Sequence, residues 1–176
     1  IGLGLPEVEQ RLFPTVPELH TDILQAYSDH YVANSSGDSW FEGVARMLAD
    51  LQQQGVKLAV ATGKSRKGLD RVLKQTNSEE LFVTTRAASE THSKPHPLML
   101  EEILAETGVQ AEHAIMVGDT SYDLEMAQNI AMPSVGVSYG VHAPELLAQF
   151  NPVCIVDDVA ALHSALLAKV QWKQAV

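Results

Sequence analysis

Apolar positions along this chain follow two different periods, and the change from one to the other comes at a polar segment near residue 35. Before that segment, apolar residues recur every three or four positions, which is the period of an amphipathic helix. After it, short apolar runs that suit buried parallel strands alternate with further stretches of helical period. This alternation predicts an α/β protein, with a parallel sheet that helices cover on both faces.

The part of the chain before the polar segment predicts two helices and no strand. They cover residues 6–13 and 17–32, and each begins at or near a proline, a residue favoured in the first helical turn. Residues 34–39 are polar and rich in serine, which indicates a linker. We therefore expect two units, a small helical unit in residues 1–36 and an α/β core in residues 37–176.

The core sequence predicts five strands separated by helices. Each expected strand is a short apolar run, and each expected helix has one apolar face. The strands are expected at residues 56–61, 81–85, 114–117, 134–137 and 154–156, and the helices at residues 41–54, 66–75, 97–107, 121–130, 145–149 and 159–169.

Composition narrows the possible partners and the compartment. A formal net charge of -10 argues against nucleic acid or an anionic membrane as the main partner. No apolar run approaches the roughly 18 residues of a membrane span. The single cysteine, Cys154, excludes an internal disulfide and suits a reducing compartment, so we expect a cytoplasmic protein.

Two aspartates follow the expected strand at residues 114–117. Asp119 would lie at the tip of that strand, and Asp123 one turn into the next helix, so both could serve one centre. Paired carboxylates are hard oxygen ligands that suit Mg²⁺. The alternative is that the two residues are only a helix cap and a solvated acid at a helix start.

A hydroxyl and a lysine follow two other expected strands. Thr62, with the amides of Gly63 and the next residues, begins a helix and could bind an anion. Lys94 is held in a stiff extended turn by Pro95, which prevents a helix there. The alternatives are a simple N-cap, made by Thr62 or Ser65, and a solvated lysine.

The order of these residues resembles the haloacid dehalogenase superfamily of Mg²⁺-dependent phosphohydrolases. The match lies in its second motif (Val60 to Gly63), its third (Lys94-Pro95) and its fourth (Gly118 to Asp123), and it is closest to the phosphoglycolate-phosphatase-like branch. The resemblance implies a three-layer, Rossmann-type sandwich, with the helices of residues 1–33 as part of an α-helical cap. It also implies hydrolysis of a small-molecule phosphate monoester through an aspartyl-phosphate.

The resemblance assigns a role to each candidate residue. Thr62 and the Gly63 amide would bind the phosphoryl oxygens, and Lys94 would offset the negative charge of nucleophile and phosphate. Asp119 would coordinate Mg²⁺, and Asp123 would either coordinate it through water or orient Lys94. The cap and its facing loops would select the substrate.

The first motif of the family, Asp-x-Asp-x-Thr, is absent from these 176 residues. It carries the nucleophile and the general acid, and the chain begins with Ile1 inside what looks like cap sequence. We therefore expect an N-terminally truncated, inactive chain that lacks its first strand. That strand would lie between the strands at 56–61 and 114–117, so we predict a gap there, filled by a missing segment, another chain's strand or a rearranged edge.

Two other functions fit parts of the same pattern. A non-catalytic α/β module could bind phosphate, Mg²⁺ or a partner, and the missing nucleophile favours it. The joint presence of Thr62, Lys94, Asp119 and Asp123 favours the phosphatase, since a binding module would not need all four. A response-regulator receiver also combines acids, a hydroxyl and a lysine, but there the acids come first and the lysine last.

Overall fold

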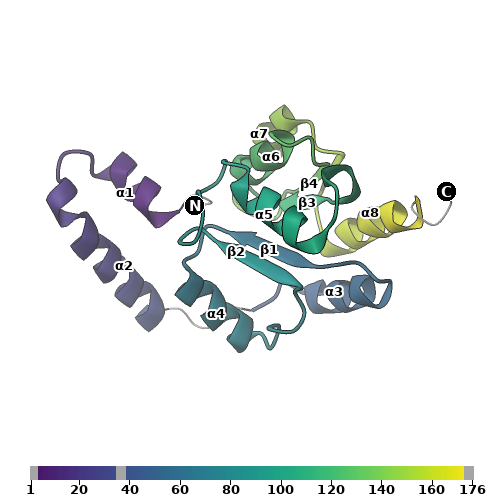
Figure 1. Ribbon diagram of the computed structural model, residues 1–176, viewed down its shortest axis with the longest axis horizontal. Helices are drawn as coiled ribbons and strands as arrows, with labels where there is room; N and C mark the ends of the chain where they lie inside the picture. The colour runs from purple at the N-terminus through teal and green to yellow at the C-terminus, as the bar shows by residue number, and fades with distance from the viewer. Residues whose placement is uncertain (1–3, 35–38, 173–176) are drawn as a thin grey trace.

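The computed structural model describes residues 4–34 and 39–172 (Figure 1). Within them, helices and strands alternate after a helical beginning. The helical beginning contains α1 (Leu5–Leu12), η1 (Pro17–Leu19) and α2 (His20–Asn34). The remainder contains α3 (Val44–Gln53), β1 (Ala59–Thr62), α4 (Arg66–Gln75), β2 (Thr84–Ala87), α5 (Leu98–Thr107), η2 (Ala111–His113), β3 (Met116–Gly118), α6 (Ser121–Gln128), β4 (Ser134–Val137), α7 (Pro144–Leu147), η3 (Ala148–Phe150), β5 (Cys154–Val156) and α8 (Val159–Trp172).

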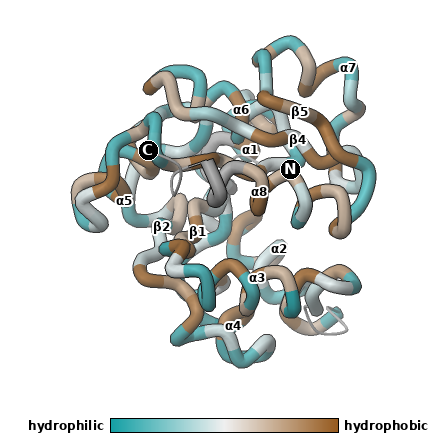
Figure 2. The backbone as a smooth tube through the Cα atoms, turned by 90° about the vertical axis from the view of Figure 1, so that its right-hand side faces the viewer, coloured by the Kyte–Doolittle hydropathy of each residue, from teal (hydrophilic) through white to brown (hydrophobic). Residues whose placement is uncertain are grey.

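The strands form two parallel sheets rather than one continuous sheet. One sheet pairs β1 with β2, and the other has the order β3-β4-β5. Figure 2 shows hydrophobic stretches along β4 and β5, as expected for strands buried between helical layers. The α/β class and its parallel strands, predicted from the alternating pattern, are confirmed.

Helices cover both faces of these sheets. On one face, α3 and α8 supply Met47, Leu51, Leu162 and Leu166, which pack with residues of β4. On the other face, α5 and α6 form a second core. Side chains of a strand point alternately to the two faces, so β3 contributes Val117 to the first core and Met116 to the second.

Strands β1 and β3 do not pair with each other in the part of the chain that the structure describes. The helices nevertheless hold both strands in the same layers. Ala61 of β1 and Met116 of β3 contact the same core on one face, and Leu58 and Val117 share the core on the other. The prediction that these strands do not pair directly is confirmed, and the filling of the gap stays a prediction.

The first two helices lie beside the core (Figure 1). The backbone N–H of Gly4 donates to Ser93 Oγ at 2.7 Å, and Lys64 Nζ donates to the Tyr31 hydroxyl at 3.3 Å. In the part of the chain that the structure describes, α2 has no buried side chain. Among the same residues, no helix has the length and apolar content needed to cross a membrane.

Several predicted boundaries were wrong, and backbone geometry explains them. The helix expected from residue 41 begins at Val44, because Gly43 has φ of 84°, outside the helical region. The strand expected at 56–61 is Ala59–Thr62, since the N–H of Val56 still closes α3 through Leu51 O at 3.0 Å. By contrast, the predictions for α4, β4 and β5 match the structure residue for residue.

Candidate active site

The fold brings the candidate residues to one edge of the sheets. Thr62 ends β1, Asp119 directly follows β3, and Lys94 lies in the segment between β2 and α5. The paired strands are parallel within each sheet, so the carboxyl ends of each sheet meet at one edge. The contact between Lys94 and Asp123 joins the edge after β2 to the edge after β3. This is where open α/β sheets bind ligands.

Thr120 and Asp123 cap the start of α6 reciprocally. The Thr120 hydroxyl accepts from the N–H of Asp123 at 3.3 Å, and the N–H of Thr120 donates to Asp123 Oδ2 at 3.2 Å. The Asp123 side chain also lies against Gly118, where a Cβ atom would come within 2.2 Å of the Asp123 Cβ. The turn after β3 therefore requires a glycine and holds the Asp123 carboxylate in one position.

Lys94 and Asp123 form a buried ion pair. Lys94 Nζ donates to Asp123 Oδ1, and the residues are only 8% and 4% exposed. Asp123 Oδ2 accepts from the Thr120 hydroxyl at 2.6 Å, so both carboxylate oxygens have protein partners. Of the two roles expected for Asp123, this geometry favours the orientation of Lys94.

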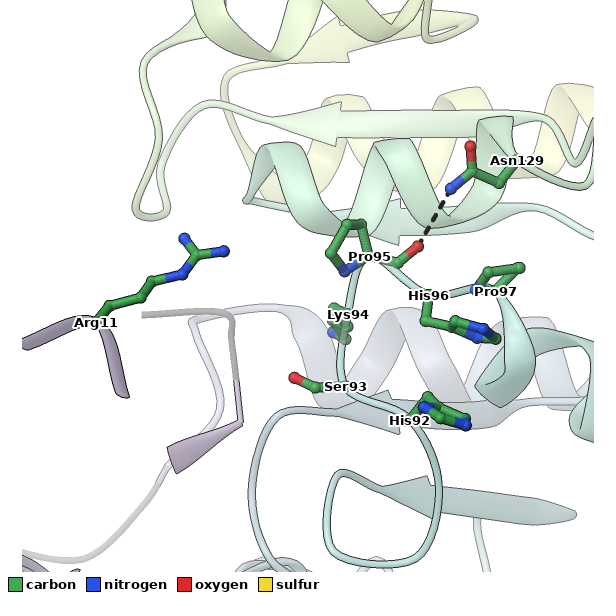
Figure 3. Close-up of a pocket in the computed structure, with 8 residues that line it drawn as sticks. All are labelled: Arg11, His92, Ser93, Lys94, Pro95, His96, Pro97 and Asn129. Carbon is green, nitrogen blue, oxygen red and sulfur yellow. Dashed lines mark hydrogen bonds between the residues drawn. The ribbon is translucent and has the colours of Figure 1, made fainter. Parts of the chain in front are cut away.

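The segment that carries Lys94 is fixed to the far end of α6. Asn129 Nδ2 donates to the carbonyl oxygen of Pro95 at 3.2 Å, as the dashed line in Figure 3 shows. The segment borders a cavity of about 450 Å³, toward which Arg11 of α1 extends (Figure 3). The lining residues are Arg11, His92, Ser93, Lys94, Pro95, His96, Pro97 and Asn129.

The loop after β4 holds Asp119. The N–H of Val141 donates to Asp119 Oδ2 at 3.0 Å, and the N–H of His142 donates to the Asp119 carbonyl oxygen at 3.0 Å. At Gly140 a Cβ atom would lie 2.2 Å from the Asp119 Cβ, so only a glycine allows this approach. Asp119 Oδ1 has no hydrogen-bond partner among residues 4–34 and 39–172, and it remains able to bind a cation.

Tyr139 lies near the charges of Asp158 and Asp119. Burial of its hydroxyl, together with the nearby charges of Asp158 and Asp119, raises the pKa of Tyr139 above its ordinary value. The phenol therefore stays neutral at physiological pH and does not add to that charge.

Thr62 is held less tightly than the acids. Its Oγ1 accepts from the N–H of Lys64 at 3.2 Å, which leaves the hydroxyl proton available to a ligand. The cap of α4 is Ser65, whose hydroxyl accepts from the N–H of Gly68 at 3.2 Å. Thr62 is therefore not the helix cap that one sequence interpretation allowed.

The comparison with protein families decides the assignment. A family profile described as haloacid dehalogenase-like hydrolase matches residues 1–137. The chain belongs to this family. Its fold and its phosphatase relatives identify it as a haloacid dehalogenase-like phosphohydrolase.

Individual relatives of this hydrolase are named phosphatases. It is 33% identical over 169 residues to the probable phosphatase IndB of Dickeya dadantii, covering 93% of this chain and 71% of that protein. It is 31% identical over 187 residues to the phosphoglycolate phosphatase of Agrobacterium fabrum, covering 99% and 78%. A crystal structure of a predicted phosphatase from Clostridium acetobutylicum superposes with a TM-score of 0.84 at 24% identity, covering 95% and 78%, which supports the fold.

The residues of this hydrolase fit a divalent cation in part. Asp119 offers one free carboxylate oxygen, and the described residues contain no group of three or more His, Cys, Asp or Glu side chains that could hold a metal. Mg²⁺ commonly takes one or two carboxylates and completes its shell with water and substrate phosphate. Asp119 is therefore compatible with a Mg²⁺ site that the substrate helps to complete.

The sequence indicated a loop at Gly140, but it did not indicate that Val141 and His142 contact Asp119. Its two hydrogen bonds to Asp119 and a third, between Ser121 and His142, all join residues at least 21 positions apart. No short motif marks such contacts. Gly140 was the one sequence feature that marked this segment, and a glycine by itself predicts only a loop.

Proposed function

We propose that this hydrolase is a Mg²⁺-dependent phosphatase that hydrolyses a small phosphate monoester through an aspartyl-phosphate. The observation that carries the proposal is the buried pair of Lys94 and Asp123 beside Asp119, at the edge where β1 presents Thr62. A buried lysine near the carboxyl ends of the strands suits a site that binds anionic oxygens. The proposed reaction belongs in the cytoplasm, in agreement with the single cysteine.

Each candidate residue receives one role in this proposal. The Thr62 hydroxyl and the Gly63 amide bind phosphoryl oxygens, and Lys94 offsets the charge of phosphate and nucleophile. Asp123 holds Lys94 in place, and Asp119 binds Mg²⁺ through Oδ1. The metal, when bound, neutralises charge on the transferred phosphoryl group and on the attacking carboxylate.

The chemistry proceeds in two displacements. A carboxylate attacks phosphorus, the ester P–O bond breaks, and the alcohol leaves with a proton supplied by a general acid. Water then attacks the phosphorus of the aspartyl-phosphate, which releases inorganic phosphate and restores the carboxylate. In both displacements the chain holds the phosphoryl oxygens and offsets their charge, and these are the roles proposed for Thr62 and Lys94.

The nucleophile is proposed to come from outside these 176 residues, which contain no Asp-x-Asp. The unpaired edges of β1 and β3 lie between shared helical layers, and both strands end at the site. A parallel strand seated between them would present its carboxyl end between Thr62 and Asp119. We infer that such a strand carries the nucleophile, and that this chain by itself is inactive.

The test compares this chain with a version fused to an Asp-x-Asp-bearing strand from a related phosphatase. Phosphate release from an aryl phosphate is measured with Mg²⁺ and with a chelator. We expect turnover only in the fused protein and only with Mg²⁺. Chelator-sensitive turnover by the unfused chain would disprove the external nucleophile, and a folded fused protein without turnover would favour the non-catalytic module.

A further inference from the structure

His142 connects the loop after β4 to the start of α6 through its ring. The N–H of Ser121, the first residue of α6, donates to His142 Nδ1 at 2.9 Å. Because Nδ1 accepts a hydrogen bond, the proton of the neutral imidazole lies on Nε2. The ring is half-buried and lies 5.8 Å from the ring of Tyr122, centroid to centroid, at an angle of 59°.

The imidazole accepts a hydrogen bond from one of the free N–H groups at the start of α6. The first N–H groups of a helix have no partner within the helix and need another acceptor. Here the Thr120 hydroxyl accepts from the N–H of Asp123, and His142 accepts from the N–H of Ser121. Two acceptors from separate parts of the chain therefore share one helix start.

Asp119 also contacts the loop that His142 joins to Ser121. Its carbonyl oxygen accepts from the N–H of His142, and its Oδ2 accepts from the N–H of Val141. The loop is thus joined to Asp119 through its main chain and to Ser121, two residues further on, through the imidazole. Loss of the ring would remove this hydrogen bond to α6. Among the described residues, the two main-chain hydrogen bonds from Val141 and His142 to Asp119 would then be the loop's remaining hydrogen bonds to this turn.

We propose that His142 is a positioning residue for Asp119: its imidazole keeps the Val141 N–H on Oδ2, so that Oδ1 points to the cation. The inference rests on the proposed function, in which Asp119 binds Mg²⁺. His142 acts through Asp119 and contacts neither substrate nor metal. Groups that orient a ligand carboxylate in this way commonly change metal affinity about 10- to 100-fold when they are removed.

The first test asks whether the imidazole contact exists in solution. Nitrogen NMR of the ¹⁵N-labelled chain should show the His142 proton on Nε2 and slow hydrogen exchange at the Ser121 amide. In His142→Ala the Ser121 amide should exchange faster. In His142→Asn it should remain protected, because the asparagine oxygen can accept in place of Nδ1. A proton on Nδ1 in the unsubstituted chain would overturn the proposal.

The second test measures cation binding with Mn²⁺ in place of Mg²⁺. Paramagnetic broadening of the Gly118 and Val141 amides is followed during a Mn²⁺ titration of the full chain. We expect His142→Ala to weaken binding about 10-fold and His142→Asn to stay close to the unsubstituted chain. The matched control is His113→Ala, which removes an imidazole just before β3, at the opposite end of that strand from Asp119.

The outcomes separate this inference from the proposed function. If Mn²⁺ broadening is absent, or survives Asp119→Ala, the metal role of Asp119 fails, and the inference fails with it. If broadening requires Asp119 but is the same in His142→Ala, only the positioning role is overturned. If His142→Ala does not fold, His142→Asn decides: retained affinity supports the proposal, and a loss equal to that of Asp119→Ala overturns it.

Discussion

The two halves of the candidate site are built differently. The half around the turn after β3 consists of buried polar and charged groups that bond to one another: Lys94, from the segment between β2 and α5, contacts Asp123, and Asp123 contacts Thr120. The half after β1 is more open, and the hydroxyl of half-buried Thr62 has one hydrogen bond within the described residues. The first half is therefore organised without a ligand, whereas the second keeps its hydrogen-bonding capacity for one.

Breaking the buried pair should have the largest effect on stability. In Lys94→Ala the Asp123 carboxylate is left buried without its cation, and removal of one partner of a buried pair typically costs about 3–5 kcal/mol. Urea unfolding of the variant measures this loss. The control is Lys57→Ala. Lys57 is exposed, and within residues 4–34 and 39–172 it donates only to Thr107 O, at 2.8 Å, so a loss of about 1 kcal/mol or less is expected. Equal losses in the two variants would contradict the comparison.

Crowding the turn after β3 should have the next largest effect. In Gly118→Ala the new Cβ would lie 2.2 Å from the Asp123 Cβ, which the cap and the ion pair hold in place. We expect a loss of about 1–3 kcal/mol, as for other overpacked sites. The control in the open half is Gly68→Ala, where the Cβ meets Ser65 Oγ at 3.3 Å and the change should stay within about 1 kcal/mol. A Gly118 variant as stable as the control would show that the turn is not rigid.

Removing the Thr62 hydroxyl should affect function more than stability. Thr62→Val loses one hydrogen bond, so unfolding should change by about 1 kcal/mol. Phosphate release by the fused enzyme should fall about 10²- to 10³-fold, as when other donors to a developing charge are removed. Thr76→Val is the matched control, because its hydroxyl donates to Val72 O at 2.8 Å away from the site. Similar turnover in both variants would remove Thr62 from the phosphate site.

The smallest effect is expected at the surface pair that supports the open half. Arg66, at the start of α4, pairs with Glu90 at 2.7 Å, and this contact lowers the pKa of the Glu90 carboxyl from 4.5. A lowered folded pKa adds stability above the unfolded value, and that stability is lost as the pH falls through the folded value. Both groups are partly exposed, so the contribution is below about 1 kcal/mol.

The test of that pair compares urea unfolding at pH 7 with unfolding near pH 3, well below the unfolded pKa. Glu90→Gln should destabilise the chain at pH 7 and lose less stability on acidification than the unsubstituted chain does. The control is Glu79→Gln. Glu79 forms no ion pair among the described residues, so this variant removes a carboxyl but no ion pair. An identical acid dependence in all three proteins would show that the pair contributes nothing.

The sequence predicted the features that depend on neighbouring residues and missed those that join distant segments. Helix α4 was predicted residue for residue, because Ser65 and the apolar period of its leucines are local signals. The positions of Asp119 after β3 and Asp123 in the first turn of α6 were predicted for the same reason, since the turn and its cap lie within a few residues. The contacts of His142 with Ser121 and Asp119 were not predicted, because they join separate loops and depend on how β4 is placed beside β3.

Strand boundaries show a second limit of the sequence. The apolar run that begins at Val56 starts before β1, because hydrophobic residues also close the preceding helix and fill the core. Hydrophobicity marks burial, and hydrogen-bond pairing decides where a strand begins. Pairing is a property of two segments, so one segment alone cannot specify it.

The unpaired edges of β1 and β3 also bear on how the molecule behaves in concentrated solution. An open strand edge is a template on which another molecule can add a strand, and this is a common start of aggregation. In the part of the chain that the structure describes, two such edges lie close to apolar cores. At neutral pH the net charge of -10 keeps molecules apart. Near the isoelectric point of about 5.0 this repulsion vanishes, and self-association should then be strongest.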